Sequence, residues 1–322
     1  ALYSKLSHKQ INTFCIGYKE HKQYSELPYA KKVANHINSK HHEILISRED
    51  FIGNIDNMLA CTDEPFADTA SIPTYLLSKY VHHKNIKVVL SGEGSDEIFL
   101  GYEHYFKMLE RYKNKGIKEE GYNLTKEWEY NHRAFHKKNI YQTYGETFTE
   151  FQKEKLFKSY TAKELLSNYN YNFNPVKWLS YIDLKVWVEN VLMTKVDKMS
   201  MAHSLELRAP FLDYKLVEYL LAVDEKIKCG DTNKYLLKRI AIKYLPKEIV
   251  YRKKRGFSTP YIEWLYEEYN QEILNTILKV NKILNLFDDS FVKFLYTEAK
   301  EKRFTQHLWS LYIFSRWFAK TY

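Results

Sequence analysis

The sequence predicts an α/β protein in which a parallel sheet is flanked by helices and followed by a mostly helical carboxyl-terminal half. Two observations lead to this class. Over residues 1–100, short apolar runs alternate with segments of helical periodicity, the pattern of strands joined by crossover helices. Beyond Gly101 only the helical periodicity continues. Because parallel strands joined in this way are covered on both faces, the sheet is expected in the first part of the chain.

The first strand and helix are predicted at the amino-terminal end. Residues 11–18 (INTFCIGY) form a short apolar run that is typical of a strand. Ser25 follows as a helix-capping residue, and Pro28 stands in the first turn of the helix. Apolar residues then recur at helical spacing over residues 30–37, which favours a helix packed on the strand.

The next elements repeat this alternation. Residues 41–47 predict a second strand, and residues 48–61 predict a second helix. A third helix is expected over residues 71–81, with Pro73 in its first turn. Residues 86–90 predict a buried strand, which completes the expected parallel sheet.

The remainder of the chain favours helices and connections. Residues 107–142 are polar and rich in tyrosine, and residues 160–175 are typical of a connection. An amphipathic helix is expected from Leu184 toward His203. Further helices are expected between Asp231 or Thr232 and Pro246, over residues 261–280, and over residues 304–319.

Composition excludes several classes of protein. The 322 residues are 45% hydrophobic and carry a net charge of +9, which indicates a globular chain of one large domain or two ordinary ones. The longest apolar runs fall short of the roughly 18 residues that span a bilayer, and no signal peptide pattern opens the sequence, so we expect a cytoplasmic protein without a membrane partner. Three dispersed cysteines favour neither a disulfide framework nor a thiolate zinc site: Cys15, Cys61 and Cys229.

The sharpest local signal is residues 87–97 (KVVLSGEGSDE), a strand that runs into a glycine turn with three carboxylates. Gly92 and Gly94 would let backbone N–H groups approach an anion at the carboxyl end of a strand, where parallel sheets bind ligands. A phosphate beside carboxylates needs a cation between them, so Asp96 indicates Mg²⁺. Glu93 is then the candidate for proton handling or for positioning a reactant. The alternative is an ordinary turn that caps a helix.

Two further stretches could contribute to a site. Residues 251–258 (YRKKRGFS) form a basic run that, by itself, is typical of a solvated loop or a nucleic-acid patch. If the run faces the acidic turn, one of its lysines could hold a leaving pyrophosphate or stabilise an oxyanion. Residues 197–213 carry Glu206 and Arg208 beside an apolar turn, a combination more typical of structural packing.

Taken together, these stretches resemble the synthetase domain of glutamine-dependent asparagine synthetases, within the ATP-pyrophosphatase superfamily. The resemblance extends from about Asn12 to about Trp264. It depends on four motifs in order: residues 62–68 (TDEPFAD), 91–97 (SGEGSDE), 204–213 (SLELRAPFLD) and 252–258 (RKKRGFS).

The resemblance implies an adenine nucleotide alpha-hydrolase-like fold and a two-step reaction that uses ATP and Mg²⁺. The side-chain carboxylate of aspartate attacks the α-phosphate and releases pyrophosphate, and ammonia from glutamine then displaces AMP to form asparagine. Six positions match family site residues, and the resemblance implies a role for each: Ser91 and Gly92 contact the nucleotide, Ile16 lines the adenosine pocket, Asp96 holds Mg²⁺, Glu93 serves the adenylate and ammonia steps, and Lys254 neutralises phosphate or pyrophosphate charge.

The sequence also departs from the family pattern. Family members carry a Ser-Gly-Gly-x-Asp-Ser pyrophosphate loop after their first strand, whereas no two glycines are adjacent in this sequence. Residues 1–6 resemble the end of the helix that follows that loop, and the glutaminase domain with its terminal cysteine is also absent. We therefore expect a carboxyl-terminal fragment of a longer chain that is close to inactive by itself.

The same resemblance implies a domain organisation and a set of partners. Residues 1–106 are expected to form the truncated nucleotide-binding part, residues 107–175 a helical insertion, and residues 176–322 the helical remainder. The expected partners are aspartate, ammonia or glutamine, the glutaminase domain of the same parent chain and a second copy in a homodimer, without nucleic acid or membrane.

Two alternative functions stay open at this point. The first is a related amide-forming ligase that acts on another carboxylate, in β-lactam formation or sugar amidation, because the motifs indicate adenylation better than they indicate the acceptor. The second is a basic, tyrosine-rich nucleic-acid-binding domain. The sequence favours an enzyme, because carboxylates cluster where a nucleic-acid groove would need lysines.

Overall fold

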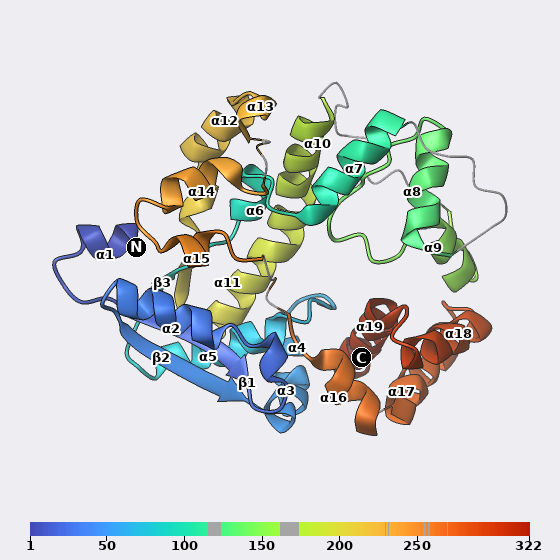
Figure 1. The fold of residues 1–322 in the computed structure, drawn as a ribbon. Helices are drawn as coiled ribbons and strands as arrows, with labels where there is room; N and C mark the ends of the chain where they lie inside the picture. The colour runs from blue at the N-terminus through green and yellow to red at the C-terminus, as the bar shows by residue number, and fades with distance from the viewer. Residues whose placement is uncertain are drawn as a thin grey trace. The chain divides into compact units, whose positions relative to one another are not determined.

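Figure 1 shows the helices and strands of the chain in the computed structural model. The chain forms two compact units, each built from three separate stretches of sequence. Unit 1 comprises Ala1–Ser91, Thr194–Arg208 and Tyr235–Tyr269, and unit 2 comprises Gly92–Met193, Ala209–Lys234 and Asn270–Tyr322. The structure describes residues 1–114, 124–161, 174–228, 230, 232–253, 256, 258–268 and 270–322. The three-part division expected from the sequence stays a prediction.

Unit 1 contains the strand, helix and strand that the sequence predicts at its start. Strands β1 (Asn12–Tyr18) and β2 (Lys40–Ile46) pair in parallel, from Asn12 opposite Lys40 to Tyr18 opposite Ile46. Helix α2 (Leu27–His36) connects them, with Pro28 in its first turn as expected. The predicted alternation over this part of the chain is therefore confirmed.

Helices cover both faces of the β1–β2 sheet. A Cβ atom on Gly17 would lie 2.5 Å from Leu27 Cδ1, so Gly17 and every second residue before it in β1 face α2. On the opposite face, the Phe14 ring lies 6.5 Å from the ring of Tyr80 on α5 (Ser71–His82). Glycine at position 17 is required because α2 begins so close to the strand.

A second sheet joins residues that are far apart in the sequence. Strand β3 (Val88–Leu90) pairs in parallel with β4 (Glu206–Arg208). The single sheet predicted from the sequence is thus present only in part, as two separate pairs of strands in the described residues. Val88 and Leu90 are 42% and 51% exposed, so the prediction that this strand is buried is wrong for both. The sequence did not predict β4, because three residues are too short for a period-two pattern.

Unit 1 contains an aromatic cluster in addition to its strands and further helices. The helix expected over residues 48–61 occurs as two shorter ones, and the first is capped by Ser47, whose hydroxyl group accepts from the N–H of Asp50. Trp264 is 1% exposed and its ring contacts those of Tyr18 and Phe51. The elements are α1 (Leu2–Leu6), η1 (Lys22–Tyr24), α3 (Arg48–Gly53), α4 (Ile55–Leu59), α11 (Thr194–Met201), α14 (Tyr235–Ala241), α15 (Lys247–Val250) and α16 (Tyr261–Glu268).

Unit 2 is helical throughout its regular elements. Its core includes Tyr105, Trp178, Leu179 and Ile182, each at most 1% exposed. The elements are α6 (Ser95–Ile98), α7 (Glu103–Asn114), α8 (Lys126–Phe135), α9 (Glu150–Leu156), α10 (Pro175–Ile182), η2 (Asp183–Met193), η3 (Pro210–Leu212), α12 (Tyr214–Ala222), α13 (Glu225–Lys228), α17 (Asn270–Leu284), α18 (Asp289–Lys300) and α19 (Thr305–Thr321). The predicted change from alternating elements to helices is therefore confirmed in this unit. None of the helices in the described part of the chain is long and apolar enough to cross a bilayer.

Candidate functional site

The glycine turn with three carboxylates, residues 91–97, is called the acidic turn. It follows β3 directly, as the sequence predicts. Gly94 has a φ of +85°, and a Cβ atom there would lie 2.1 Å from Leu212 Cδ2. Both the backbone conformation and the packing therefore require glycine at this position. Nothing lies within 4 Å of a Cβ atom on Gly92, so the backbone of that residue has open space beside it. The expected glycine turn at the end of a strand is confirmed in its geometry.

Asp96, the predicted Mg²⁺ ligand, forms an ion pair within unit 2. Its Oδ2 atom lies 3.1 Å from Nζ of Lys234, and the same ammonium group donates to Ser95 Oγ over 2.9 Å. The side chains of Asp96 and Lys234 are 22% and 20% exposed, so solvent screens this charge pair only in part. The positive charge beside the turn thus comes from Lys234, which sequence reasoning did not identify.

Residues 233 and 234 pack closely against the backbone of Gly101 and against Asp96 of the acidic turn. A Cβ atom on Gly101 would lie 2.0 Å from Asp96 Oδ1 and 2.3 Å from Lys234 Cε. The Asn233 side chain donates to the Gly101 carbonyl oxygen over 3.0 Å, and Lys234 itself has a left-handed φ of 53°. No local pattern in the sequence could have indicated this arrangement, because it joins positions more than 130 residues apart.

Two other carboxylates of the turn differ in their surroundings. Glu93 is half-buried. Glu97 is 1% exposed, and burial raises its pKa to about 7, although a hydrogen bond of 2.7 Å from the Tyr102 hydroxyl group favours the ionised form. Glu97 therefore belongs to the interior of unit 2.

Among the described residues, Ile16 and Ser91 are the members of unit 1 that the resemblance placed at the site. Ile16 lies on β1, is 4% exposed, and shares with Phe14 the face of the sheet that α5 covers. Ser91 follows β3, and its N–H group donates to the Arg208 carbonyl oxygen over 2.9 Å. Lys254 lies outside the described residues. The roles expected for Ile16, Ser91 and Lys254 stay predictions.

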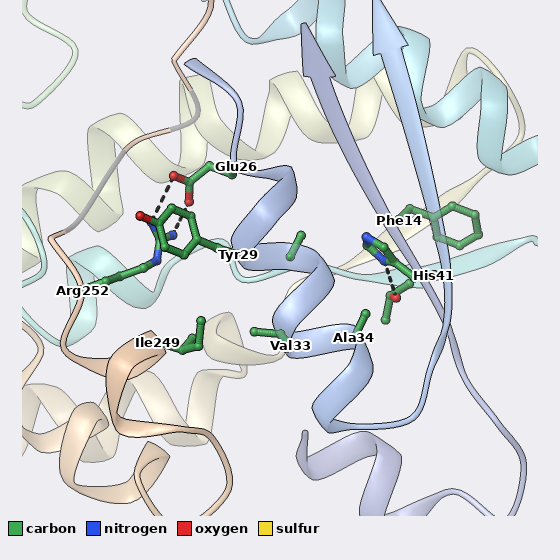
Figure 2. A pocket seen from close by; sticks show the side chains of 10 residues that line it. Phe14, Glu26, Tyr29, Val33, Ala34, His41, Ile249 and Arg252 are labelled. Carbon is green, nitrogen blue, oxygen red and sulfur yellow. Dashed lines mark hydrogen bonds and ion pairs between the residues drawn. The ribbon is translucent and has the colours of Figure 1, made fainter. Parts of the chain in front are cut away.

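A pocket of about 300 Å³ lies on the α2 side of the β1–β2 sheet (Figure 2). One wall carries Arg252, whose guanidinium group pairs with Glu26 and lies 4.6 Å from the centroid of the Tyr29 ring. The charges of Glu26 and Arg252 offset each other, which leaves a mainly apolar surface. Ile16 is not among the residues that line it: Thr13, Phe14, Glu26, Tyr29, Ala30, Val33, Ala34, His41, Ile249 and Arg252.

Comparison with known proteins identifies the family. The family model described as asparagine synthase matches residues 1–319. The chain belongs to the asparagine synthase family. The resemblance seen in the sequence motifs is thereby confirmed.

Individual asparagine synthetases support the same membership. The chain is 28% identical to asparagine synthetase [glutamine-hydrolyzing] 1 of Bacillus subtilis over 98% of its own length and 53% of that protein. It is 29% and 28% identical to the asparagine synthetases [glutamine-hydrolyzing] of Mus musculus and Bos taurus, over 77% of this chain and 34% of each protein. The chain thus spans about half the length of the bacterial relative.

The described residues could bind Mg²⁺ only together with a nucleotide, whose phosphate oxygens would supply further ligands. In the described parts of this asparagine synthase chain, no group of three or more His, Cys, Asp or Glu side chains could hold a metal ion. Mg²⁺ at nucleotide sites is commonly held by one or two carboxylates together with phosphate oxygens and water. Asp96 can supply one such carboxylate, at the end of a strand and beside an open glycine backbone.

Proposed function

We propose that the chain is the synthetase part of a glutamine-dependent asparagine synthetase with an adenine nucleotide alpha-hydrolase-like fold. The observation that carries the proposal is the acidic turn, in which an open glycine backbone and the Asp96–Lys234 ion pair follow a parallel strand in a chain of the asparagine synthase family. The cytoplasm is the compartment in which MgATP, aspartate and glutamine would be available to it.

In the proposed reaction, an oxygen atom of the aspartate side chain attacks the α-phosphorus of ATP. The bond from that phosphorus to the bridging oxygen breaks, and pyrophosphate leaves. Ammonia then attacks the activated carbonyl carbon, the bond to AMP breaks, and one proton passes from nitrogen to a base. Asparagine, AMP and pyrophosphate are the products.

Each proposed role uses a property of the residue concerned. The backbone at Ser91 and Gly92 approaches the nucleotide, and Ile16 provides an apolar surface for adenosine. Asp96 would hold Mg²⁺, which offsets phosphate charge when bound. Glu93, half-buried in the turn, handles the proton of the ammonia step, and Lys254 offsets the charge of the departing pyrophosphate.

The central experiment measures products in the protein at its natural full length. With ATP, Mg²⁺, aspartate and either glutamine or ammonia, we expect equal amounts of AMP, pyrophosphate and asparagine. The absence of AMP and pyrophosphate would contradict the proposal. Pyrophosphate release with another carboxylate, and none with aspartate, would indicate a ligase for β-lactam formation or sugar amidation.

A single substitution tests the role of Glu93. Glu93→Gln keeps the shape of the side chain but removes its charge, so MgATP should bind as before while asparagine formation falls at least about a hundredfold. Unchanged asparagine formation would show that Glu93 has another role.

Two partners belong to the same proposal. Ammonia would come from a glutaminase domain of the same parent chain, and a homodimer is the expected assembly. Light scattering of the full-length protein, and glutamate release that depends on glutamine, would test them separately.

A further inference from the structure

Two residues bracket the basic run of residues 252–255 in unit 1. At the start of the run, Arg252 pairs with Glu26, the residue that precedes α2. After the run, Thr259 is 5% exposed, its hydroxyl group donates to the Thr69 carbonyl oxygen over 3.3 Å, and it accepts a hydrogen bond of 3.4 Å from Tyr18. Tyr18 is the last residue of β1, and α2 begins beyond the same end of that strand. Arg252 and Thr259 are therefore both fastened near the carboxyl end of β1, where parallel sheets bind ligands.

Arg252, at the start of the run, makes both a paired hydrogen bond and a ring contact. Arg252 forms two hydrogen bonds with the two carboxylate oxygens of Glu26, one of them 3.0 Å long, and this fork geometry is specific to arginine. The guanidinium carbon also lies 4.6 Å from the centroid of the Tyr29 ring (Figure 2). Both charged side chains are about a quarter exposed, which limits screening by solvent.

A second ion pair between the same two regions offers a contrast. Lys32 on α2 lies 3.1 Å from Glu248 on α15, but the two side chains are 59% and 65% exposed. Exposed pairs of this kind contribute little to stability. Of the two ion pairs, the partly buried Glu26–Arg252 pair is therefore the better candidate to hold the start of the basic run against α2.

We propose that Glu26, Tyr29 and Arg252 form a positioning anchor, in which Glu26 and Tyr29 fix Arg252, the first residue of the basic run, near the carboxyl end of β1. Arg252 is two residues before Lys254, so the chain that leads to the proposed phosphate-neutralising lysine starts from a fixed point. None of the three anchor residues needs to contact substrate. This inference rests on the proposed function only for the role of Lys254.

Trypsin provides a test that does not depend on activity, because the run itself contains its cleavage sites. In Glu26→Gln, the first cleavage within residues 252–255 of the native protein should become roughly tenfold faster, since cleavage follows the population of open states. Glu248→Gln, the matched control, should change this rate less than about twofold. Mass spectrometry would locate the cuts, and the melting temperature of each variant would show that it is folded.

The effect of the anchor on catalysis is tested by the kinetics of pyrophosphate release. Glu26→Gln should lower kcat for pyrophosphate release roughly tenfold, with the KM for aspartate nearly unchanged, and Arg252→Lys should behave alike because it cannot form the fork. Equal trypsin rates in Glu26→Gln and Glu248→Gln would overturn the anchor. Faster cleavage with unchanged kcat would overturn its positioning role. A wild-type protein without any pyrophosphate release would contradict the proposed function, while the cleavage rates would still decide the anchor.

Discussion

The Tyr105 hydroxyl group donates a hydrogen bond of 2.6 Å to Asp183 Oδ2, across 78 positions of the chain. Asp183 is 0% exposed and also accepts hydrogen bonds from Tyr141, Thr143 and the backbone N–H of Tyr144. Burial raises its pKa to about 6, and the four hydrogen bonds oppose this effect. The carboxylate thus joins α7, α10 with η2, and the segment that follows α8.

We expect Asp183→Asn to destabilise unit 2 strongly. An amide has one acceptor oxygen in place of two, and its NH₂ group would face hydrogen-bond donors inside the core. The expected loss is about 2 to 4 kcal/mol in the free energy of unfolding, measured by urea denaturation at pH 7. Asp56→Asn, at an exposed position on α4, serves as the control and should change the free energy by less than about 0.5 kcal/mol.

The two glycines of the acidic turn should respond differently to alanine. Gly94→Ala adds a Cβ atom where Leu212 leaves no room and where φ is positive, so we expect a loss of about 2 kcal/mol or more. Gly92→Ala meets open space and should change stability by less than about 1 kcal/mol. Thermal unfolding of the two variants side by side gives the comparison. Equal melting temperatures would show that the turn is not fixed by Leu212.

His307 should make unit 2 sensitive to acid. Burial lowers its pKa to about 3, and Nε2 lies 2.9 Å from Gln152 Oε1, so the folded protein holds the ring neutral. The unfolded chain takes up a proton below about pH 6.5, so stability is full above that pH and is lost as the pH falls toward 3. Between pH 7 and pH 4 the free energy of unfolding of the wild type should therefore fall more than that of His307→Gln. The difference should be on the order of 2 to 3 kcal/mol. His8→Gln, at an exposed position, should follow the wild type.

Lys234 should be needed for the chemistry of the acidic turn. Lys234→Met keeps most of the side-chain length but removes the charge that holds Asp96 and Ser95. We expect kcat/KM for pyrophosphate release to fall by roughly ten- to a hundredfold. Lys226→Met, an exposed lysine of α13, should leave it unchanged. Full activity in Lys234→Met would show that the Asp96–Lys234 ion pair has only a structural role.

Local patterns predicted the elements that depend on neighbouring residues. The apolar run of β1, the helix with Pro28 and the glycine turn before Asp96 are all properties of short stretches, and the structure contains them. The resemblance to asparagine synthetases came from four such stretches taken together.

Features that depend on distant residues could not be predicted in this way. The Glu26–Arg252 anchor joins positions 226 residues apart, and one lysine among many, Lys234, is selected by the fold to meet Asp96. The 11-residue π-helix η2 also escaped prediction, because its apolar pattern is close to that of an α-helix and the buried Asp183 at its start has partners elsewhere.

The pairing of β3 with β4 has a consequence for how the chain is made. During synthesis, Val88–Leu90 leave the ribosome long before Glu206–Arg208 have been made. The strand that leads into the acidic turn therefore lacks its partner β4 while more than a hundred further residues are added. Contacts of such long range form late. The turn that carries Glu93 and Asp96 is therefore expected to reach its final geometry only after Arg208 has been added, when the helices between these strands have begun to fold.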